Sequence, residues 1–107
     1  MVMKLKFPKK VEIGHVTFTV SYNKNIGCGA SFSFADRSIE IGTVQLKRDP
    51  NTVFMLICHE VMEIIHCINC TRYLDGSVIG NYMFIMDHKQ FEVNNNMFSQ
   101  AIRQFLE

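Results

Sequence analysis

The sequence has no excess of charge of either sign. Eleven Lys and Arg residues stand against ten Asp and Glu residues, which gives a formal net charge of +1. The lysines are spread along the chain and form no basic stripe interleaved with aromatic residues. Domains that bind nucleic acids usually carry such a basic patch. We therefore expect no nucleic-acid partner.

Long apolar runs are also missing. The opening residues, MVMKLKFPKK, contain no apolar core of the length that a secretory signal requires. No segment reaches the roughly 18 uncharged apolar residues of a membrane span. We expect a cytoplasmic protein with no membrane partner, in which the four cysteines are free thiols. Cys67 and Cys70 have C-x-x-C spacing, but they lie at the end of a predicted helix and not at its start, so we interpret them as buried thiols.

A chain of 107 residues suits a single domain, residues 1–107, with one core. In VEIGHVTFTVSY, alternating apolar residues predict two strands joined at Gly14-His15, with a bulge at Gly14 as the alternative. Alternation returns in SFSFADRSIEIG, where Asp36-Arg37 is the expected break. These segments predict a small, mostly antiparallel sheet of hairpins.

The rest of the chain predicts two helices. Asp49 and Pro50 are typical of a helix start, and we expect that helix over residues 50–70. TRYLDGSVIGN reads as a loop and YMFIM as a short buried strand. DHKQFEVNNNMFSQAIRQFLE predicts a closing helix with Phe91, Phe98, Ile102 and Phe105 on one face. The expected fold class is α+β, with strands followed by helix, strand and helix.

The first of these helices is apolar but carries four ionisable side chains. At about 100° per residue, His59, Glu60, Glu63 and His66 fall within one arc of roughly 120°, and apolar residues fill most of the remaining circumference. A solvated face would explain such an arc, but the helix carries no Lys or Arg on it. Imidazole and carboxylate groups are the donors that a borderline divalent metal takes. The arc therefore favours a metal site.

The order H-E-x-x-E in residues 59–63 has a specific geometric meaning. Positions i and i+4 lie one above the other on a helix, so His59 and Glu63 can reach one ion together. Glu60 lies beside them, where it could take a proton from water. LICHEVMEII resembles the active-site helix of the zincin-like metallopeptidases, whose usual motif is H-E-x-x-H. The early hairpins and FIMDHKQFE resemble compact, gluzincin-type zincin-like proteins of phages and prophages.

The resemblance implies a zinc ion, a peptide or protein substrate and Glu60 as the catalytic base. Glu63 stands where the family has its second His, and His88 stands where the gluzincin pattern has a Glu. We therefore expect His59, Glu63 and His88 as ligands, with Glu92 as the reserve for the third. His66 is a secondary candidate, which we expect to lie near the metal site or in the core and not to bind the metal itself.

Two further expectations follow from this resemblance. Tyr73 or Tyr82 is expected to donate to the developing oxyanion, and the sequence does not choose between them. A sheet edge in residues 38–42 is expected to bind an extended peptide by strand addition. The alternative function is a non-catalytic phage or prophage accessory protein with a structural or vestigial metal site. The oligomeric state is left open by the sequence.

Overall fold

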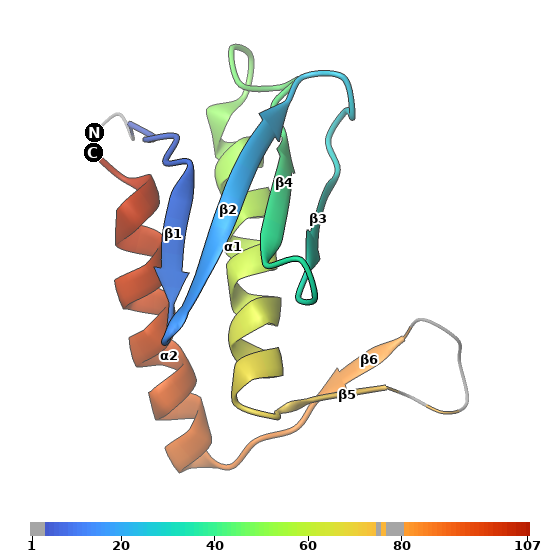
Figure 1. Ribbon diagram of the computed structural model, residues 1–107, viewed down its shortest axis with the longest axis vertical. Helices are drawn as coiled ribbons and strands as arrows, with labels where there is room; N and C mark the ends of the chain where they lie inside the picture. Colours follow the sequence, from blue (N-terminus) through green and yellow to red (C-terminus); the bar gives the residue numbers. More distant parts are fainter. Residues whose placement is uncertain (1–3, 75, 77–80) are drawn as a thin grey trace.

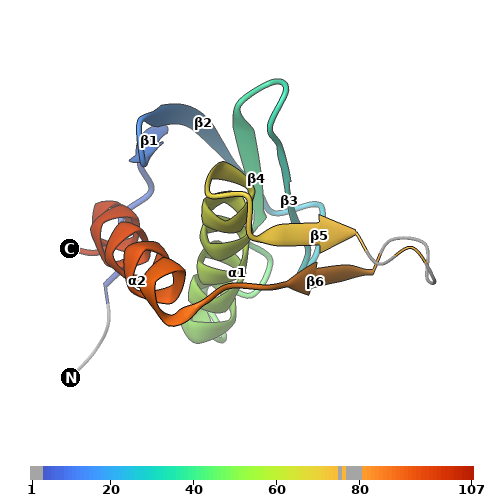
Figure 2. The ribbon, with the colours of Figure 1, turned by 90° about the horizontal axis from the view of Figure 1, so that it is seen from below.

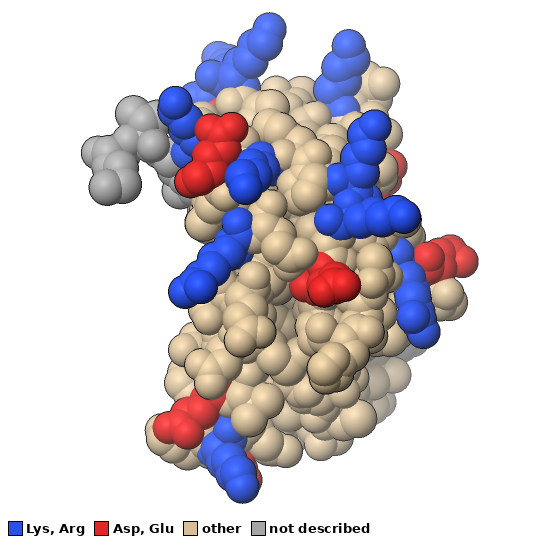
Figure 3. Space-filling model, turned by 60° about the vertical axis from the view of Figure 1, so that its left-hand side comes forward, with Lys and Arg blue, Asp and Glu red and all other residues tan. Residues whose placement is uncertain are grey.

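The structure is a computed structural model that describes residues 4–74, 76 and 81–107. A four-stranded sheet packs against two helices, and a separate two-stranded sheet extends from one end of the molecule (Figures 1 and 2). The predicted α+β class is confirmed. On the face shown in Figure 3, Lys and Arg side chains gather towards the end where the termini lie, and the other end is mostly uncharged.

The main sheet has the order β1-β2-β4-β3. Its strands are β1 (Lys10–Ile13), β2 (Val16–Asn23), β3 (Ala30–Ser33) and β4 (Ser38–Gly42). The predicted hairpin at Gly14-His15 is confirmed, and Gly14 has a φ of +63°, which a residue without Cβ adopts readily. The sheet is mostly antiparallel, as predicted, and its one parallel pairing joins β2 to β4. β3 and β4 form the second hairpin, which folds β4 back against β2.

The two edges of this sheet differ. At the β1 edge, the side chain of Gln104 accepts a hydrogen bond from the backbone N–H of Glu12 at 2.8 Å and donates one to its carbonyl oxygen at 2.7 Å. The other edge is β3. The prediction that residues 38–42 form an edge is therefore wrong, since β4 has a partner on both sides. Any strand added next to α1 would pair with β3.

Gly42 lies where two segments of backbone approach each other. Its N–H donates to the carbonyl oxygen of Gly29 at 2.8 Å, and a Cβ at this position would overlap the carbonyl oxygens of Gly27 and Gly29. Backbone atoms cannot move aside as the end of a flexible side chain can. The close approach therefore requires a residue without a side chain.

We expect Gly42→Ala to lower the free energy of unfolding by about 1 to 3 kcal/mol, the usual cost of forcing an extra methyl group into a packed site. Gly76→Ala is the control, because a Cβ at Gly76 meets no atom of the described residues within 4 Å. Urea unfolding of both variants measures the difference. Equal stability of the two variants would contradict the assignment of a close backbone contact.

Helix α1 (Pro50–Ile68) crosses the inner face of the sheet. Pro50 occupies the first turn as predicted, but the Asp49 carboxylate accepts from the Thr52 hydroxyl at 2.7 Å and not from a backbone N–H. The helix ends two residues before the predicted Cys70, which has a φ of +57°. The buried face of α1 packs against strand side chains to form the core, which comprises Val11, Ile13, Phe18, Val20, Ile39, Ile41, Val53, Ile57, Val61, Ile64, Ile65, Ala101, Ile102 and Phe105.

By length and composition alone, α1 would be long and apolar enough to cross a membrane, with a mean hydropathy of 1.3. It is, however, the central helix of this fold, and a core helix of a soluble protein passes the same test. The two glutamates within it belong to the polar arc. The structure is thus consistent with a soluble protein, and the cytoplasmic location stays a prediction.

Helix α2 (His88–Ile102) and the short 3₁₀ helix η1 (Arg103–Phe105) close the chain. Asp87 and Gln90 form a reciprocal capping box that fixes the start of α2. Ile102 and Phe105 are buried as predicted, but Phe91 is 56% exposed, so the apolar face of this helix is shorter than expected. Lys6 N–H donates to the carbonyl oxygen of Phe105 at 2.8 Å, which joins the two ends of the chain.

Strands β5 (Arg72–Leu74) and β6 (Tyr82–Phe84) form the second sheet. The predicted loop TRYLDGSVIGN thus begins with a strand, while residues 75 and 77–80 lie outside the described part of the chain. β6 is exposed along its whole length, so the prediction of a buried strand is wrong. The register pairs Arg72 with Phe84 and Leu74 with Tyr82, and these four side chains therefore share one face of the hairpin.

Candidate metal centre

His59, Glu60 and Glu63 come together on α1. Each offers one potential ligand atom, and these atoms all lie within 4.8 Å of one another. Within residues 4–74, 76 and 81–107, this is the one such group of three. His59 and Glu63 are one helical turn apart, as the H-E-x-x-E spacing predicts. The predicted arc therefore gathers one imidazole and two carboxylates that could hold a metal ion.

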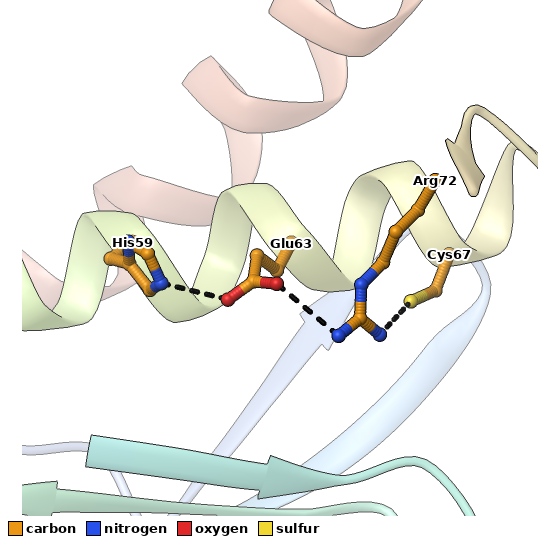
Figure 4. A network of polar contacts seen from close by, with 4 residues as sticks. All are labelled: His59, Glu63, Cys67 and Arg72. Atoms are coloured by element: carbon orange, nitrogen blue, oxygen red, sulfur yellow. Dashed lines mark hydrogen bonds and ion pairs between the residues drawn. The ribbon is translucent and has the colours of Figure 1, made fainter. Parts of the chain in front are cut away.

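A chain of polar contacts runs along α1 from this group (Figure 4). His59 Nε2 lies 2.7 Å from Glu63 Oε2, and the other oxygen of Glu63 lies 3.3 Å from a guanidinium nitrogen of Arg72. Arg72 also donates to the sulfur of Cys67 at 3.1 Å. Glu63 thus has one oxygen held by a cation and the other directed at His59. Oε2 and Nε2 are the two donor atoms that converge.

Glu60 differs from its neighbours in burial. Its side chain is 6% exposed, and no hydrogen bond to it occurs among the residues that the structure describes. Burial raises the pKa of its carboxyl group above the usual value; the nearby His59 lowers it and Glu63 raises it. A carboxylate in such surroundings is a stronger base than one in water.

The His59 side chain lines two separate pockets. On one side lies a groove of about 530 Å³ with apolar walls, lined by Asn51, Phe54, Met55, Cys58, His59, Met62, Glu63, His66, Phe84 and Phe98. On the other side, a hollow of about 430 Å³ lies between α1 and Ala30 of the edge strand β3, and Glu60 lines it. The His59 side chain is 66% exposed and is accessible from both hollows.

The structure places His88 outside this group. Its side chain is 84% exposed at the start of α2, and its Nδ1 lies 3.6 Å from Glu92 Oε1. In the part of the chain described, neither residue joins His59 and Glu63 within ligand distance of a common point. The part of His88 or Glu92 as third ligand therefore stays a prediction, while the structure brings Glu60 to the place where a third donor would stand.

His66 is buried in a separate polar network. Its Nδ1 lies 2.7 Å from the Thr71 hydroxyl and 3.4 Å from the amide nitrogen of Asn94. The amide oxygen of Asn94 accepts from Asn69 at 2.6 Å, so the Asn94 nitrogen must face the ring as a donor. The ring of His66 is thus enclosed by the hydroxyl of Thr71 and the amide of Asn94.

Burial lowers the pKa of His66 below the usual 6.5, against the opposing effect of Glu63. Between the two pKa values, His66 is protonated in the unfolded chain and neutral in the folded protein. The contribution of the neutral His66 side chain to the free energy of unfolding is fully present above about pH 6.5. It is lost as pH falls towards the lower pKa that His66 has in the folded state. The raised pKa of Glu60 acts in the opposite direction. Its contribution to the free energy of unfolding is fully present at pH values below the pKa of Glu60 in the unfolded chain, and it is lost as pH rises through the pKa in the folded protein.

We therefore expect the free energy of unfolding of the metal-free protein to decline less steeply between pH 6.5 and pH 5 in His66→Gln than in the wild type. Urea unfolding at several pH values measures the slope. His15→Gln, at an exposed position in the β1–β2 turn, is the matched control. Parallel profiles for His66→Gln and the wild type would show that His66 is not held neutral.

Of the two candidate tyrosines, only Tyr82 reaches the polar chain. The guanidinium carbon of Arg72 lies 3.5 Å from the centre of the Tyr82 ring and 5.5 Å from that of Phe32. Tyr73 lies on the opposite face of the hairpin by register. All four cysteines are free, as predicted, but the expectation of buried thiols at Cys67 and Cys70 is wrong for Cys70, which is exposed, and Cys67 is half-buried.

Comparisons of the chain with protein-family models, with curated proteins and with solved structures found no match. No family, relative or solved structure therefore supports the resemblance to zincin-like peptidases. What the structure supports is coarser: a His59, Glu60 and Glu63 group that could hold a metal ion of undetermined identity.

The sequence interpretation missed two residues of this region. Arg72 lies in a segment that reads as a loop, and nothing in the local pattern indicates that its side chain reaches Glu63. Asn94 did leave a signal, because three consecutive asparagines are unusual inside a helix. Only the first of them is buried, at 3% exposed, and it forms the network around His66.

Proposed function

We propose that this protein is a zinc-dependent hydrolase that cleaves peptide bonds, with His59 and Glu63 as ligands and Glu60 as general base. The observation that carries the proposal is the convergence of the three potential ligand atoms within 4.8 Å. The three groups differ in their surroundings: the His59 imidazole is exposed, the Glu63 carboxylate has one oxygen bound by Arg72, and the Glu60 carboxylate is buried. The two hollows that meet at His59 provide space for a substrate.

The donor set suits zinc. One imidazole nitrogen and carboxylate oxygens are borderline and hard donors of the kind that catalytic zinc sites combine. Glu63 Oε2 and His59 Nε2 are separated by a hydrogen-bond distance of 2.7 Å, and a small side-chain rotation opens it for an ion. When bound, a zinc ion would polarise the scissile carbonyl and lower the pKa of its bound water.

Glu60 is the residue best suited to move the proton. Its burial and raised pKa favour proton uptake from an attacking water, and the protonated carboxyl can then pass the proton to the leaving amine. Its hollow borders β3, so a water or substrate can reach it from the side of the free edge. Tyr82 is held by Arg72, and its part as an oxyanion donor stays a prediction.

The substrate that suits this surface is an extended peptide. A peptide pairing with β3 (Ala30–Ser33) would run beside the hollow that contains His59 and Glu60, with backbone hydrogen bonds giving affinity. The apolar groove on the other side of His59 would accept a large apolar side chain. We therefore propose strand addition at β3 and not at residues 38–42, because β4 has a partner on both sides.

A non-catalytic accessory module of phage or prophage type is the second candidate. The observation that favours it is the exposed apolar surface of the β5–β6 hairpin and its surroundings, formed by Tyr73, Leu74, Tyr82, Met83, Phe84, Ile85 and Phe91. Surfaces of this kind often contact other proteins. In this second function, the metal group would be structural or vestigial.

Two measurements on the purified protein test the proposal. Metal analysis should find about one zinc per chain, and a fluorogenic peptide library should be cleaved, with activity lost on chelation and restored by zinc. His88→Ala and Glu92→Gln should lower zinc affinity if either is a third ligand, with His15→Ala as the exposed control. Zinc bound without any hydrolysis would favour the accessory module, and a protein that takes up no zinc would exclude both metal functions.

A further inference from the structure

The Arg72 side chain lies outside the candidate ligands but contacts one of them. From strand β5, its guanidinium contacts Glu63 and Cys67 on α1 and lies over the ring of Tyr82 on β6. The ring of Phe32 on β3 lies further away, at 5.5 Å. One side chain therefore joins the β5–β6 hairpin, the edge strand and the helix that carries the site.

This arrangement has a cost that packing alone does not explain. The Arg72 side chain is 18% exposed, and its Nε is the one buried side-chain nitrogen or oxygen without a hydrogen-bond partner among the described residues. An unsatisfied buried N–H destabilises the fold. Apolar residues often replace buried ion pairs without loss of stability. A role at the neighbouring site would account for an arginine here.

The contact with Glu63 gives that role. A carboxylate has two equivalent oxygens and rotates freely unless one of them is held. Arg72 binds Oε1, and Oε2 is then the atom that faces His59 Nε2 at 2.7 Å. Groups that orient a metal ligand through its second atom usually matter to metal affinity.

We propose that Arg72 is a positioning residue, which ties the β5–β6 hairpin to Glu63 and thereby fixes the carboxylate of Glu63 beside His59. Its importance for zinc binding rests on the proposed function, while its connection of the hairpin to Glu63 does not. Arg72 acts through Glu63 and needs no contact with a substrate. The planar guanidinium is required, because a lysine ammonium cannot hold Glu63 and Cys67 together and stack on Tyr82.

A double-mutant cycle tests the proposal. Zinc affinity, measured by competition with a chelator, should fall about 10-fold to 100-fold in Arg72→Met, and Arg72→Lys should not restore it. In the Glu63→Gln background, Arg72→Met should cause no further loss, because its target is gone. Arg103→Met, at an exposed arginine, is the matched control. Unchanged or tighter binding in Arg72→Met, or additive losses in the double variant, would overturn the proposal.

Hydrogen exchange of the metal-free protein separates this inference from the proposed function. Arg72→Met and Glu63→Gln should each speed amide exchange in β5 and β6 several-fold, and the double variant should exchange no faster than Arg72→Met. This result supports the connection even in a protein that binds no zinc or cleaves no peptide. Exchange rates equal to those of the wild type in Arg72→Met would show that Arg72 does not hold the hairpin, and the proposal would fail.

Discussion

Glu60→Gln is expected to lower peptide hydrolysis by roughly 10²-fold to 10⁴-fold, the usual contribution of a positioned general base. The amide keeps the shape of the side chain but cannot accept the proton. Zinc content should stay near that of the wild type, since His59 and Glu63 are unchanged. Initial rates on a cleaved library peptide, with metal analysis of the same sample, measure both effects.

The stability of this variant gives a second readout. Because burial raises the pKa of Glu60, the ionised carboxylate destabilises the folded state at neutral pH, and a neutral amide should leave the protein equally or more stable. Lost activity in a protein of unchanged stability is typical of a catalytic group. Glu40→Gln, on the central strand β4, is the control. Full activity in Glu60→Gln would remove Glu60 from the mechanism, and loss of zinc would make it a ligand.

His59→Ala is expected to abolish stoichiometric zinc binding and to remove the stabilisation that zinc gives. A ligand present at about 100 times its dissociation constant stabilises the folded state by about 2.7 kcal/mol, so the melting temperature in the presence of zinc should fall measurably. Without zinc the two proteins should melt at similar temperatures, because the His59 side chain is 66% exposed. Calorimetry with and without zinc measures the difference.

Glu63→Gln should weaken zinc binding less completely, because a neutral amide oxygen replaces an anionic one. His15→Ala should behave as the wild type in both measurements. A His59→Ala protein that still holds one zinc per chain would place the metal elsewhere in the molecule. The group on α1 would then be a polar cluster without a metal function.

Features that depend on neighbouring residues were predicted well from the sequence. Gly14-His15 as a turn, Pro50 at a helix start and the arc of His59, Glu60 and Glu63 all follow from spacing along a single element. The parallel pairing of β2 with β4 was not predictable in this way. The alternating patterns of β2 and β4 are also compatible with a series of consecutive hairpins. Only the tertiary arrangement decides between that series and the parallel pairing.

The residues of the site that the sequence did not indicate lie on elements other than α1. Arg72 reaches Glu63 from the first residue of β5, shortly after the chain leaves α1, and no periodicity in TRYLDGSVIGN indicates that contact. The choice of His88 as a ligand relied on the order of residues in a family, whereas distance decides coordination. The structure pairs His88 with Glu92, and a third ligand on α2 stays a prediction.

The unequal edges of the main sheet also limit how copies of this protein can aggregate. Fibres that grow by strand pairing need two free edges on every molecule, one to receive a neighbour and one to offer. Gln104 occupies the backbone groups of Glu12 in the middle of the four-residue strand β1, so β3 is the less obstructed edge of this sheet. Two molecules joined through β3 would expose only their obstructed β1 edges, and further growth by strand pairing through this sheet would be hindered.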